Sequence, residues 1–245
     1  MMDAGQITSD ALQYPLKKFS KVIILGIITI LSVLIIPGFL VLGYLYKIIK
    51  SSLEGSSEVP DFNQWVSMFV DGLKVFVVLF IYSFVPSVLV LLGIWAALLP
   101  VLSVPGEGSL LNSNLAISLV SGLALIGIGL QLVISFIIPI ALANMAHHNE
   151  LKAAFGLKEI YGKIKEIGGV DYLIWYIIMV IIVGVIYYAS FILIFPFFIG
   201  LIIVPLIILP FFTIFFARST ALVYNSAISE DHEYYRHKKQ INNKY

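Results

Sequence analysis

Three features of the sequence predict an all-α integral membrane protein. Of the 245 residues, 60% are hydrophobic and only 12% are charged, whereas a soluble domain is about one quarter charged. The mean hydropathy is +1.01. Four long stretches contain no Lys, Arg, Asp or Glu, and they cover residues 22–46, 75–106, 108–146 and 172–217. A chain with so little polar surface is solvated by lipid, and a helix that crosses a bilayer needs about 20 apolar residues.

The first charge-free stretch, 22–46, has two interpretations. It is long enough for one tilted span, but Pro37 and Gly38 inside it would break or kink a helix, which suggests a re-entrant or short hairpin. A crossing would separate the three Lys residues that precede residue 22 from the remaining 12 of the 15 basic residues, whereas a hairpin keeps all 15 on one side. The positive-inside tendency favours the hairpin. We therefore predict four transmembrane helices plus the hairpin, with five spans as the alternative.

The second and third stretches predict two of the spans. They meet at Glu107, inside the turn-rich run VPGEGS at 104–109, where Pro and Gly interrupt a helix. We expect the spans at about 76–100 and 115–143.

The last stretch, 172–217, is 46 residues long and is long enough for two spans, with a turn near Pro196. Segment 173–195 alone contains 15 Leu, Ile, Val or Phe residues, which favour insertion by roughly 5–9 kcal/mol. In the second half, Pro205 and Pro210 each remove a hydrogen bond to the backbone carbonyl four residues earlier. Such carbonyls can line a transport path, although a simple kink is the preferred interpretation.

Amphipathic segments lie between the apolar stretches, and we expect them to form interfacial helices. One covers about 61–73, where Asp61 followed by Gln64 resembles a capping box. A second covers about 149–167, and a shorter one occupies 9–20. The apolar faces of the second and third consist of Leu157, Ile160, Tyr161, Ile164 and Ile167, and of Leu12, Leu16 and Phe19.

The organisation that follows is simple. Residues 1–225 are predicted to form a single membrane domain, and residues 226–245 a polar C-terminal tail that is poorly ordered beyond the last helix. The charged segments and the tail are predicted to be cytoplasmic, because basic residues concentrate on that side of a membrane.

Several motifs are similar to those of one known family. They are GYLYKIIK at 43–50, VPDF at 59–62, FVDGLK at 69–74, PIALANMA at 139–146, and LKAAF at 151–155 followed by Glu159 and Ile160. In this order they resemble the uncharacterised prokaryotic membrane family known as domain of unknown function 4013, over roughly residues 14–225. One departure is that Phe62 stands where family members often carry Trp. The resemblance implies a multi-pass membrane protein and no assigned activity or functional residue.

The spans themselves contain no ionisable residue, which argues against proton or ion coupling. Small residues, Gly93 with Ala97 and Ser118 with Gly122, are spaced so that the two middle spans can pack closely. Among the remaining polar groups are Ser118, Ser121, Gln131, Ser135 and Thr213. We interpret them as hydrogen-bonding groups between helices.

The best candidate for a metal site in the sequence consists of His147, His148 and Glu150. Neighbouring residues on a helix point about 100° apart, so the two imidazoles would not face one ion. His232 and His237 could join them only through the tertiary fold. We interpret these histidines as interfacial and solvated.

Four acidic residues, Glu54, Glu58, Asp61 and Asp71, could be read as paired carboxylates for acid–base chemistry. Nothing in the sequence fixes their separation or removes them from water, so capping and a solvated helix face account for them. The absence of Cys excludes thiol catalysis. The sequence therefore predicts no catalytic, cofactor-binding or metal-binding residue, no cofactor, and a protein that is not an enzyme.

The function that these observations favour is that of a non-enzymatic membrane protein with an organising, anchoring or regulatory role. The alternative is a transporter or channel for a neutral or apolar solute. The expected partners are the lipid bilayer and either a membrane-protein partner or a second copy of the chain. A net charge of +1 gives no reason to expect nucleic acid.

Overall fold

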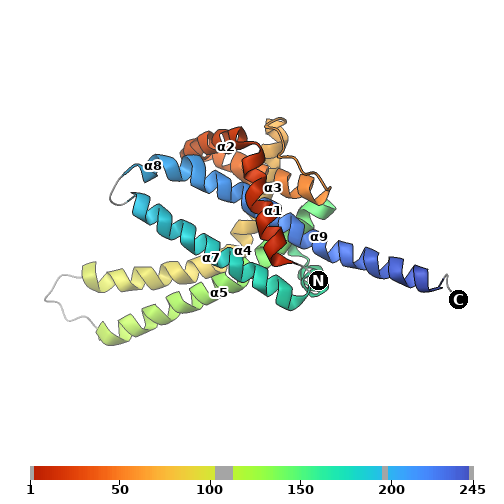
Figure 1. Cartoon of the computed structure of the whole chain (residues 1–245). Helices are drawn as coiled ribbons and strands as arrows, with labels where there is room; N and C mark the ends of the chain where they lie inside the picture. Colours follow the sequence, from red (N-terminus) through yellow and green to blue (C-terminus); the bar gives the residue numbers. More distant parts are fainter. Residues whose placement is uncertain (1–2, 103–112, 195–197, 243–245) are drawn as a thin grey trace. The chain divides into compact units, whose positions relative to one another are not determined.

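The computed structural model describes the backbone of residues 3–102, 113–194 and 198–242, and the side chains of residues 3–95, 122–194 and 198–227. The described residues are almost entirely helical and include no strand (Figure 1). The predicted all-α class is confirmed.

Two compact units divide the chain. Unit 1 contains Met1–Phe76 and Ile140–Tyr245, and unit 2 contains Val77–Pro139. The helices α4 (Trp65–Leu102) and α5 (Ser113–His148) pass from one unit into the other.

Four of the described helices are long and apolar enough to cross a membrane, which confirms the predicted number of spans. The crossing segments are Trp65–Trp95, Gly122–His148, Gly169–Ile194 and Gly200–Ala227. They belong to α4, to α5, to α7 (Gly169–Ile194), and to a continuous rod made of α8 (Gly200–Ile203), the π-helical turn η3 (Val204–Ile208) and α9 (Leu209–Asn242). The turns expected near Glu107 and Pro196 lie outside the described residues.

The stretch 22–46 forms a helical hairpin, as predicted. It consists of α2 (Phe19–Leu31), the 3₁₀ turn η1 (Ser32–Leu34) and α3 (Ile36–Leu53). The chain reverses at Ile35, where φ is +67°, and Pro37 lies in the first turn of α3. The proline therefore starts the second helix of the hairpin and does not kink the middle of a single one.

The hairpin is too short to cross a bilayer. At 1.5 Å per residue, its apolar arms, 22–34 and 36–46, reach about 20 and 16 Å, whereas the hydrocarbon core is about 30 Å thick. Its tip consists of the aliphatic residues 33–36, which are 64–88% exposed. An apolar tip with this exposure is stable in acyl chains and not in water.

Two further predicted interfacial helices are present. The first, α1 (Ala4–Lys17), is capped by the side chain of Asp3, and the second is α6 (Leu157–Ile167), preceded by the 3₁₀ turn η2 (Leu151–Phe155). The residues expected to face lipid from the first segment, Leu12, Leu16 and Phe19, are 40–60% exposed. On α6 the buried residues are Ile160, Ile164 and Ile167, while Leu157 and Tyr161 of the predicted face stay exposed.

The prediction of a separate interfacial helix at 61–73 is wrong. The backbone of Gln64 has a φ of +58°, which is incompatible with a right-handed helix, so α4 starts at Trp65 and runs on without a break into the first span. The capping box is wrong for the same reason, and the Asp61 carboxylate binds a lysine from another helix.

Close backbone contact joins α3 to α4 within unit 1. A Cβ atom at Gly43 would overlap the carbonyl oxygen of Met68, and one at Gly72 would overlap the carbonyl oxygen of Phe39. The two contacts are reciprocal. Met68 lies one helical turn before Gly72 on α4, and Phe39 lies one helical turn before Gly43 on α3. This crossing permits Cα–H···O contacts and leaves no room for a side chain.

Within unit 2, α4 and α5 run side by side (Figure 1). A Cβ atom at Gly93 would lie 2.8 Å from Cβ of Ala124, and one at Gly127 would lie 2.9 Å from the carbonyl oxygen of Pro86. The expected close packing of these spans is therefore present through Gly93, whereas Gly122 faces open space. The side chains of Ala97 and Ser118 lie outside the described residues.

The last helix differs from the expectation of a poorly ordered tail. In the described backbone α9 continues from Leu209 to Asn242, so the polar residues after 226 extend the helix that crosses the membrane.

Candidate functional site

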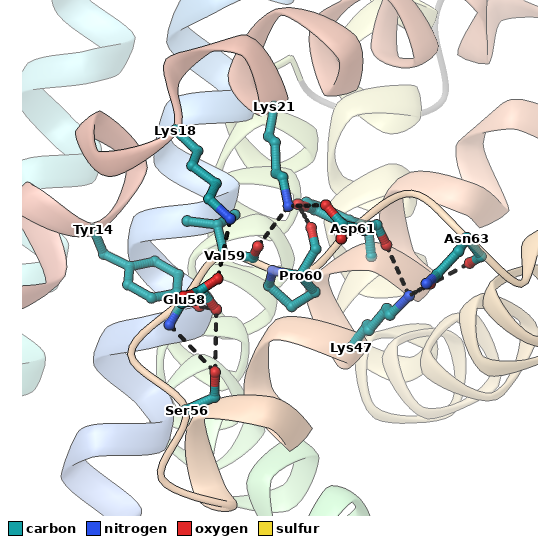
Figure 2. A network of polar contacts seen from close by, with 11 residues as sticks. Tyr14, Lys18, Lys21, Lys47, Ser56, Glu58, Val59, Pro60, Asp61 and Asn63 are labelled. Carbon is teal, nitrogen blue, oxygen red and sulfur yellow. Dashed lines mark hydrogen bonds and ion pairs between the residues drawn. The ribbon is translucent and has the colours of Figure 1, made fainter.

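The polar groups of unit 1 collect around the loop 54–64, between α3 and α4. Figure 2 shows side chains from α1, α2 and α3 converging on this loop. Most of their bonds reach backbone carbonyl oxygens, so the loop serves as a common anchor for several helices.

Asp61 connects the two ends of the hairpin. Lys21, at the start of α2, donates hydrogen bonds to the Asp61 carboxylate and, over 2.6 Å, to the carbonyl oxygen of Val59. Lys47 of α3 donates to the carbonyl oxygen of Asp61 over 2.8 Å and also to the side chain of Asn63. Lys21 at one end of the hairpin and Lys47 at the other are thereby bound to the same loop. The hairpin therefore begins and ends on the same side of its apolar tip.

The charges in this cluster perturb one another. The hydrogen bond from Lys21 holds the pKa of the Asp61 carboxyl below its usual value. Burial lowers the pKa of Lys47, because the charged form of an amine is less stable away from water. The Lys21 side chain is only 9% exposed, so its charge depends on the loop for compensation.

Two buried tyrosines hold the loop from opposite sides. The hydroxyl of Tyr14 in α1 donates to the carbonyl oxygen of Glu58 over 2.7 Å, and that of Tyr44 in α3 donates to the carbonyl oxygen of Pro60 over 2.8 Å. The Tyr44 ring stacks on Phe62 with 4.1 Å between centroids. Burial raises the pKa of both tyrosines, which keeps the hydroxyls protonated as donors.

Arg218 ties the last span to the same loop. Its Nε donates to Asp10 of α1 over 3.0 Å, and its Nη1 donates to the carbonyl oxygen of Ser56 over 2.7 Å. The guanidinium carbon lies 4.8 Å from the centroid of the Tyr14 ring, a cation–π distance. With 7% of its surface exposed, this arginine is a structural link between α1, the loop and α9.

A second polar cluster joins α5 to α9. The Asn144 side chain donates to the carbonyl oxygen of Ala153 over 3.0 Å and accepts a hydrogen bond from the Tyr224 hydroxyl over 2.8 Å. Asn144 is 1% exposed. The amide is thus satisfied inside the protein, and the cluster positions helices without presenting a reactive group.

The described histidines, His147 and His148, lie in the last turn of α5. The rings of His147 and His148 are nearly perpendicular, with 5.0 Å between centroids, and His148 Nε2 lies 2.7 Å from a carboxylate oxygen of Glu159. The described residues contain no group of three or more His, Cys, Asp or Glu side chains that could hold a metal ion. The side chains of His232 and His237 lie outside the described residues.

Three of the four acidic residues considered from the sequence are paired with lysines, and the fourth, Glu54, forms no ion pair with a described residue. Asp61 binds Lys21, and Asp71 lies 2.8 Å from Lys74. Glu58 accepts from Lys18 over 3.1 Å. This arrangement stabilises carboxylates and does not favour the shared proton of a carboxyl pair.

The prolines of the last span have a packing role on the side of α2. A Cβ atom at Gly26 would overlap the carbonyl oxygen of Leu206, and this is the carbonyl whose hydrogen bond Pro210 removes. The π-helical turn at 204–208 therefore lies directly against α2. A carbonyl covered in this way is not available to line a solute path.

Two of the cavities lined by described side chains are considered as candidates for binding. The first, the α3–α4 pocket, belongs to unit 1 and has a volume of about 270 Å³. Its lining residues are Tyr46, Lys47, Lys50, Ser51, Glu54, Gln64, Ser67, Met68 and Asp71. Of the four acidic residues considered from the sequence, Glu54 and Asp71 line this pocket, whereas Glu58 and Asp61 do not.

The second cavity, the unit 2 groove, lies between α4 and α5 and has a volume of about 690 Å³. Its lining residues are Ser83, Ser87, Val90, Leu91, Ile128, Gln131, Leu132 and Ser135. Four of these eight residues are polar although they lie within spans. Gln131 donates to Ser83 over a long 3.5 Å, which confirms a polar contact between helices.

Sequence reasoning missed the residues that hold unit 1 together. Lys21 and Arg218 sit at the ends of charge-free stretches, where a charge is easily assigned to solvent. Tyr44 lies inside one of the family motifs and Tyr14 outside them. The signal that could have found Tyr44 and Lys47 is their helical spacing of three residues, which places them near each other on α3.

The fold and these contacts define a multi-pass, all-helical membrane protein with a hydrogen-bonded polar layer at one end of its helices. The chain belongs to the family described as "Protein of unknown function (DUF4013)", which matches residues 27–195. Neither a curated protein nor a solved structure matches the chain. Three of the family-like motifs, at 43–50, 59–62 and 69–74, contact one another around Gly43, Tyr44 and Lys47.

Proposed function

We propose that this protein is a non-enzymatic organiser that holds a partner's membrane helix against the unit 2 groove. The observation that carries the proposal is the set of polar side chains from two spans in that one groove: Ser83 and Ser87 from α4, Gln131 and Ser135 from α5. Polar side chains inside a membrane are usually turned toward another helix or a water-filled cavity.

The walls of the groove favour a helix over a solute as the occupant. Leu91 is 64% exposed, Leu132 54% and Ile128 49%, so the polar groups lie in a trough with aliphatic edges that face acyl chains. The Gln131 amide has two donors and an acceptor. A transmembrane helix that carries a hydroxyl or amide side chain would satisfy this amide and cover the leucines.

The sidedness of the protein follows from its charge distribution. Four spans return the chain to its starting side, so the loop 54–64, the segment 149–168 and the tail share one face of the membrane. Contacts across unit 1 agree with this, since Lys50 donates to Asn149 over 3.1 Å and Asn225 donates to the carbonyl oxygen of Leu53 over 3.2 Å. We propose that this face is cytoplasmic, because it carries the basic residues.

Site-directed cross-linking in native membranes tests the docking role. The chain has no Cys, so Ser87→Cys provides a single thiol in the groove for a photoreactive label, and Val85→Cys, 59% exposed and outside the groove lining, provides the control. The expected result is a discrete adduct from position 87 and none from position 85. Adding Gln131→Leu should remove the adduct.

The outcomes separate the alternatives. An adduct twice the mass of the chain identifies a second copy as the occupant, and an adduct of another mass identifies a different membrane protein. Equal labelling from both positions, or an adduct insensitive to Gln131→Leu, contradicts the proposal. Flux of a neutral solute through reconstituted vesicles, blocked by a bulky label at position 87, would instead establish the transport alternative.

A further inference from the structure

The α3–α4 pocket contains charged side chains that form no ion pair with another described residue. Lys47 Nζ bonds the carbonyl oxygen of Asp61 and the side chain of Asn63, and Lys50 Nζ bonds the amide oxygen of Asn149 over 3.1 Å. All of these acceptors are neutral. Among the described residues neither lysine forms an ion pair.

The acidic residues of the pocket differ from each other. Asp71 is paired with Lys74 over 2.8 Å, so its charge is compensated within the protein. Glu54 forms no ion pair with a described residue. Among the described residues, the pocket therefore presents two lysines and one carboxylate that form no ion pair, in about 270 Å³.

The position of the pocket beside the start of the first span indicates that its ligand comes from the bilayer. Gln64, Ser67 and Met68 of its wall flank the first turn of α4, where Trp65 is 46% exposed and Val66 78% exposed. An exposed Trp at the start of a span is typical of the headgroup level of a bilayer. The polar end of a ligand that enters here would contact the lysines of the pocket. Its apolar end would lie along the lipid-exposed side of α4.

We propose that the α3–α4 pocket binds the headgroup of an aminophospholipid, with its phosphate between Lys47 and Lys50 and its ammonium at Glu54. The phosphodiester carries one negative charge and accepts hydrogen bonds from both lysines. The volume is below the range of about 300–1,000 Å³ that holds drug-sized ligands, which suits a headgroup whose acyl chains stay outside. Burial also lowers the pKa of Lys47, and a bound phosphate would relieve this unfavourable environment.

Native mass spectrometry of the full chain in a phosphate-free maltoside detergent tests the proposal. The probes are dihexanoyl phosphatidylethanolamine, dihexanoyl phosphatidylglycerol, dihexanoylglycerol and free phosphoethanolamine. We expect phosphatidylethanolamine to bind most tightly and dihexanoylglycerol, which has no phosphate, not to bind. Binding of free phosphoethanolamine with similar affinity would support the headgroup chemistry and identify a soluble ligand as its source.

Two variants and one control make the test specific. Lys50→Gln keeps a donor for Asn149 but removes a charge, and it should weaken binding of both phospholipids by about tenfold or more. Glu54→Gln should remove the preference for phosphatidylethanolamine over phosphatidylglycerol and leave phosphatidylglycerol binding intact. Lys152→Gln, at an exposed surface pair, should bind as the unmodified chain does.

Three results would overturn the proposal. The first is equal binding of dihexanoylglycerol, which would make the association apolar. The second is unchanged phospholipid binding in Lys50→Gln. The third is phosphatidylglycerol bound as tightly as phosphatidylethanolamine by the unmodified chain, which would remove the role of Glu54. None of these results bears on cross-linking from the unit 2 groove, so this proposal and the proposed function fail separately.

Discussion

Unit 1 and unit 2 use their polar side chains in different ways. In unit 1, lysines, tyrosines and an arginine donate to carbonyl and carboxylate oxygens of other helices and of the loop 54–64, mostly over 2.6–3.1 Å. In unit 2, the polar side chains line a groove, and the described contact between its helices, from Gln131 to Ser83, is 3.5 Å long. The difference indicates that polar groups hold the helices of unit 1 to its loop, whereas polar groups of unit 2 line a groove.

Backbone packing supports the same contrast. Unit 1 contains the reciprocal contact of Gly43 and Gly72 with opposite carbonyls, together with the buried network around the loop. Unit 2 also places glycines at its helix contact, but with less overlap: an added Cβ would lie 2.8 Å from Cβ of Ala124 at Gly93 and 2.9 Å from the Pro86 carbonyl oxygen at Gly127, whereas at Gly43 and Gly72 it would overlap a carbonyl oxygen. Substitutions in unit 1 should therefore reduce stability, and substitutions in the unit 2 groove should change association with little effect on stability.

The largest effect is expected at the crossing of α3 and α4. Gly43→Ala forces a methyl group into the carbonyl of Met68, and separating two backbones should cost about 3 kcal/mol or more. Gly184→Ala, on α7 with no atom near the added Cβ, is the matched control and should be neutral or stabilising by up to about 1 kcal/mol. Denaturation in mixed micelles, followed by circular dichroism, measures both. Equal stability of the two variants would contradict the close crossing.

The next effect is expected from Arg218→Met. The change leaves Asp10 and the Ser56 carbonyl without their donor, and because Asp10 is 42% exposed the cost should be about 2–3 kcal/mol, below that of a fully buried pair. The same unfolding measurement applies. Lys152→Met, at a surface pair with 85% exposure of the lysine side chain, should show no measurable change.

A pH effect should follow from the contact between Lys21 and Asp61. The folded protein lowers the pKa of the Asp61 carboxyl through the bond from Lys21. The resulting stabilisation is fully present above the unfolded pKa, about 3.9, and is lost as the pH falls through the lower folded pKa. The difference in melting temperature between the unmodified chain and Asp61→Asn should therefore be constant near pH 7 and shrink below about pH 4. A difference that grows on acidification would contradict this assignment.

The smallest effect on stability is expected in the groove. Gln131→Leu removes a long hydrogen bond within the membrane, which is worth about 0.6 kcal/mol on average, so unfolding should be nearly unchanged. The same variant should abolish the adduct formed from Ser87→Cys. A large loss of stability with the adduct preserved would show that Gln131 acts as a structural residue of unit 2.

The parts of this fold that were predictable depend on local pattern. Charge-free stretches predicted the four spans, and the count of basic residues with Pro37 predicted the hairpin. The turn itself lies at Ile35, which has a positive φ that an aliphatic residue gives no reason to expect.

The predictions failed where a residue far away in the sequence binds a group that was assigned to a local contact. Asp61 followed by Gln64 is a local capping pattern, but Lys21 lies 40 residues earlier and takes the carboxylate. The open carbonyl at Leu206, which was the alternative to the preferred simple kink at Pro210, is covered by Gly26. A single sequence contains no information about which far segment will occupy such a group, so the polar layer of unit 1 became visible only in three dimensions.

The central claim is that the polar layer of unit 1 holds both ends of the 22–46 hairpin on one face of the membrane. Single thiols at Ser9→Cys and Glu54→Cys, on either side of the hairpin, test it with a membrane-impermeant maleimide applied to intact cells and then to permeabilised cells. Both positions should react only after permeabilisation. Labelling of one position in intact cells and of the other only after permeabilisation would mean that 22–46 crosses the bilayer, and would contradict the account.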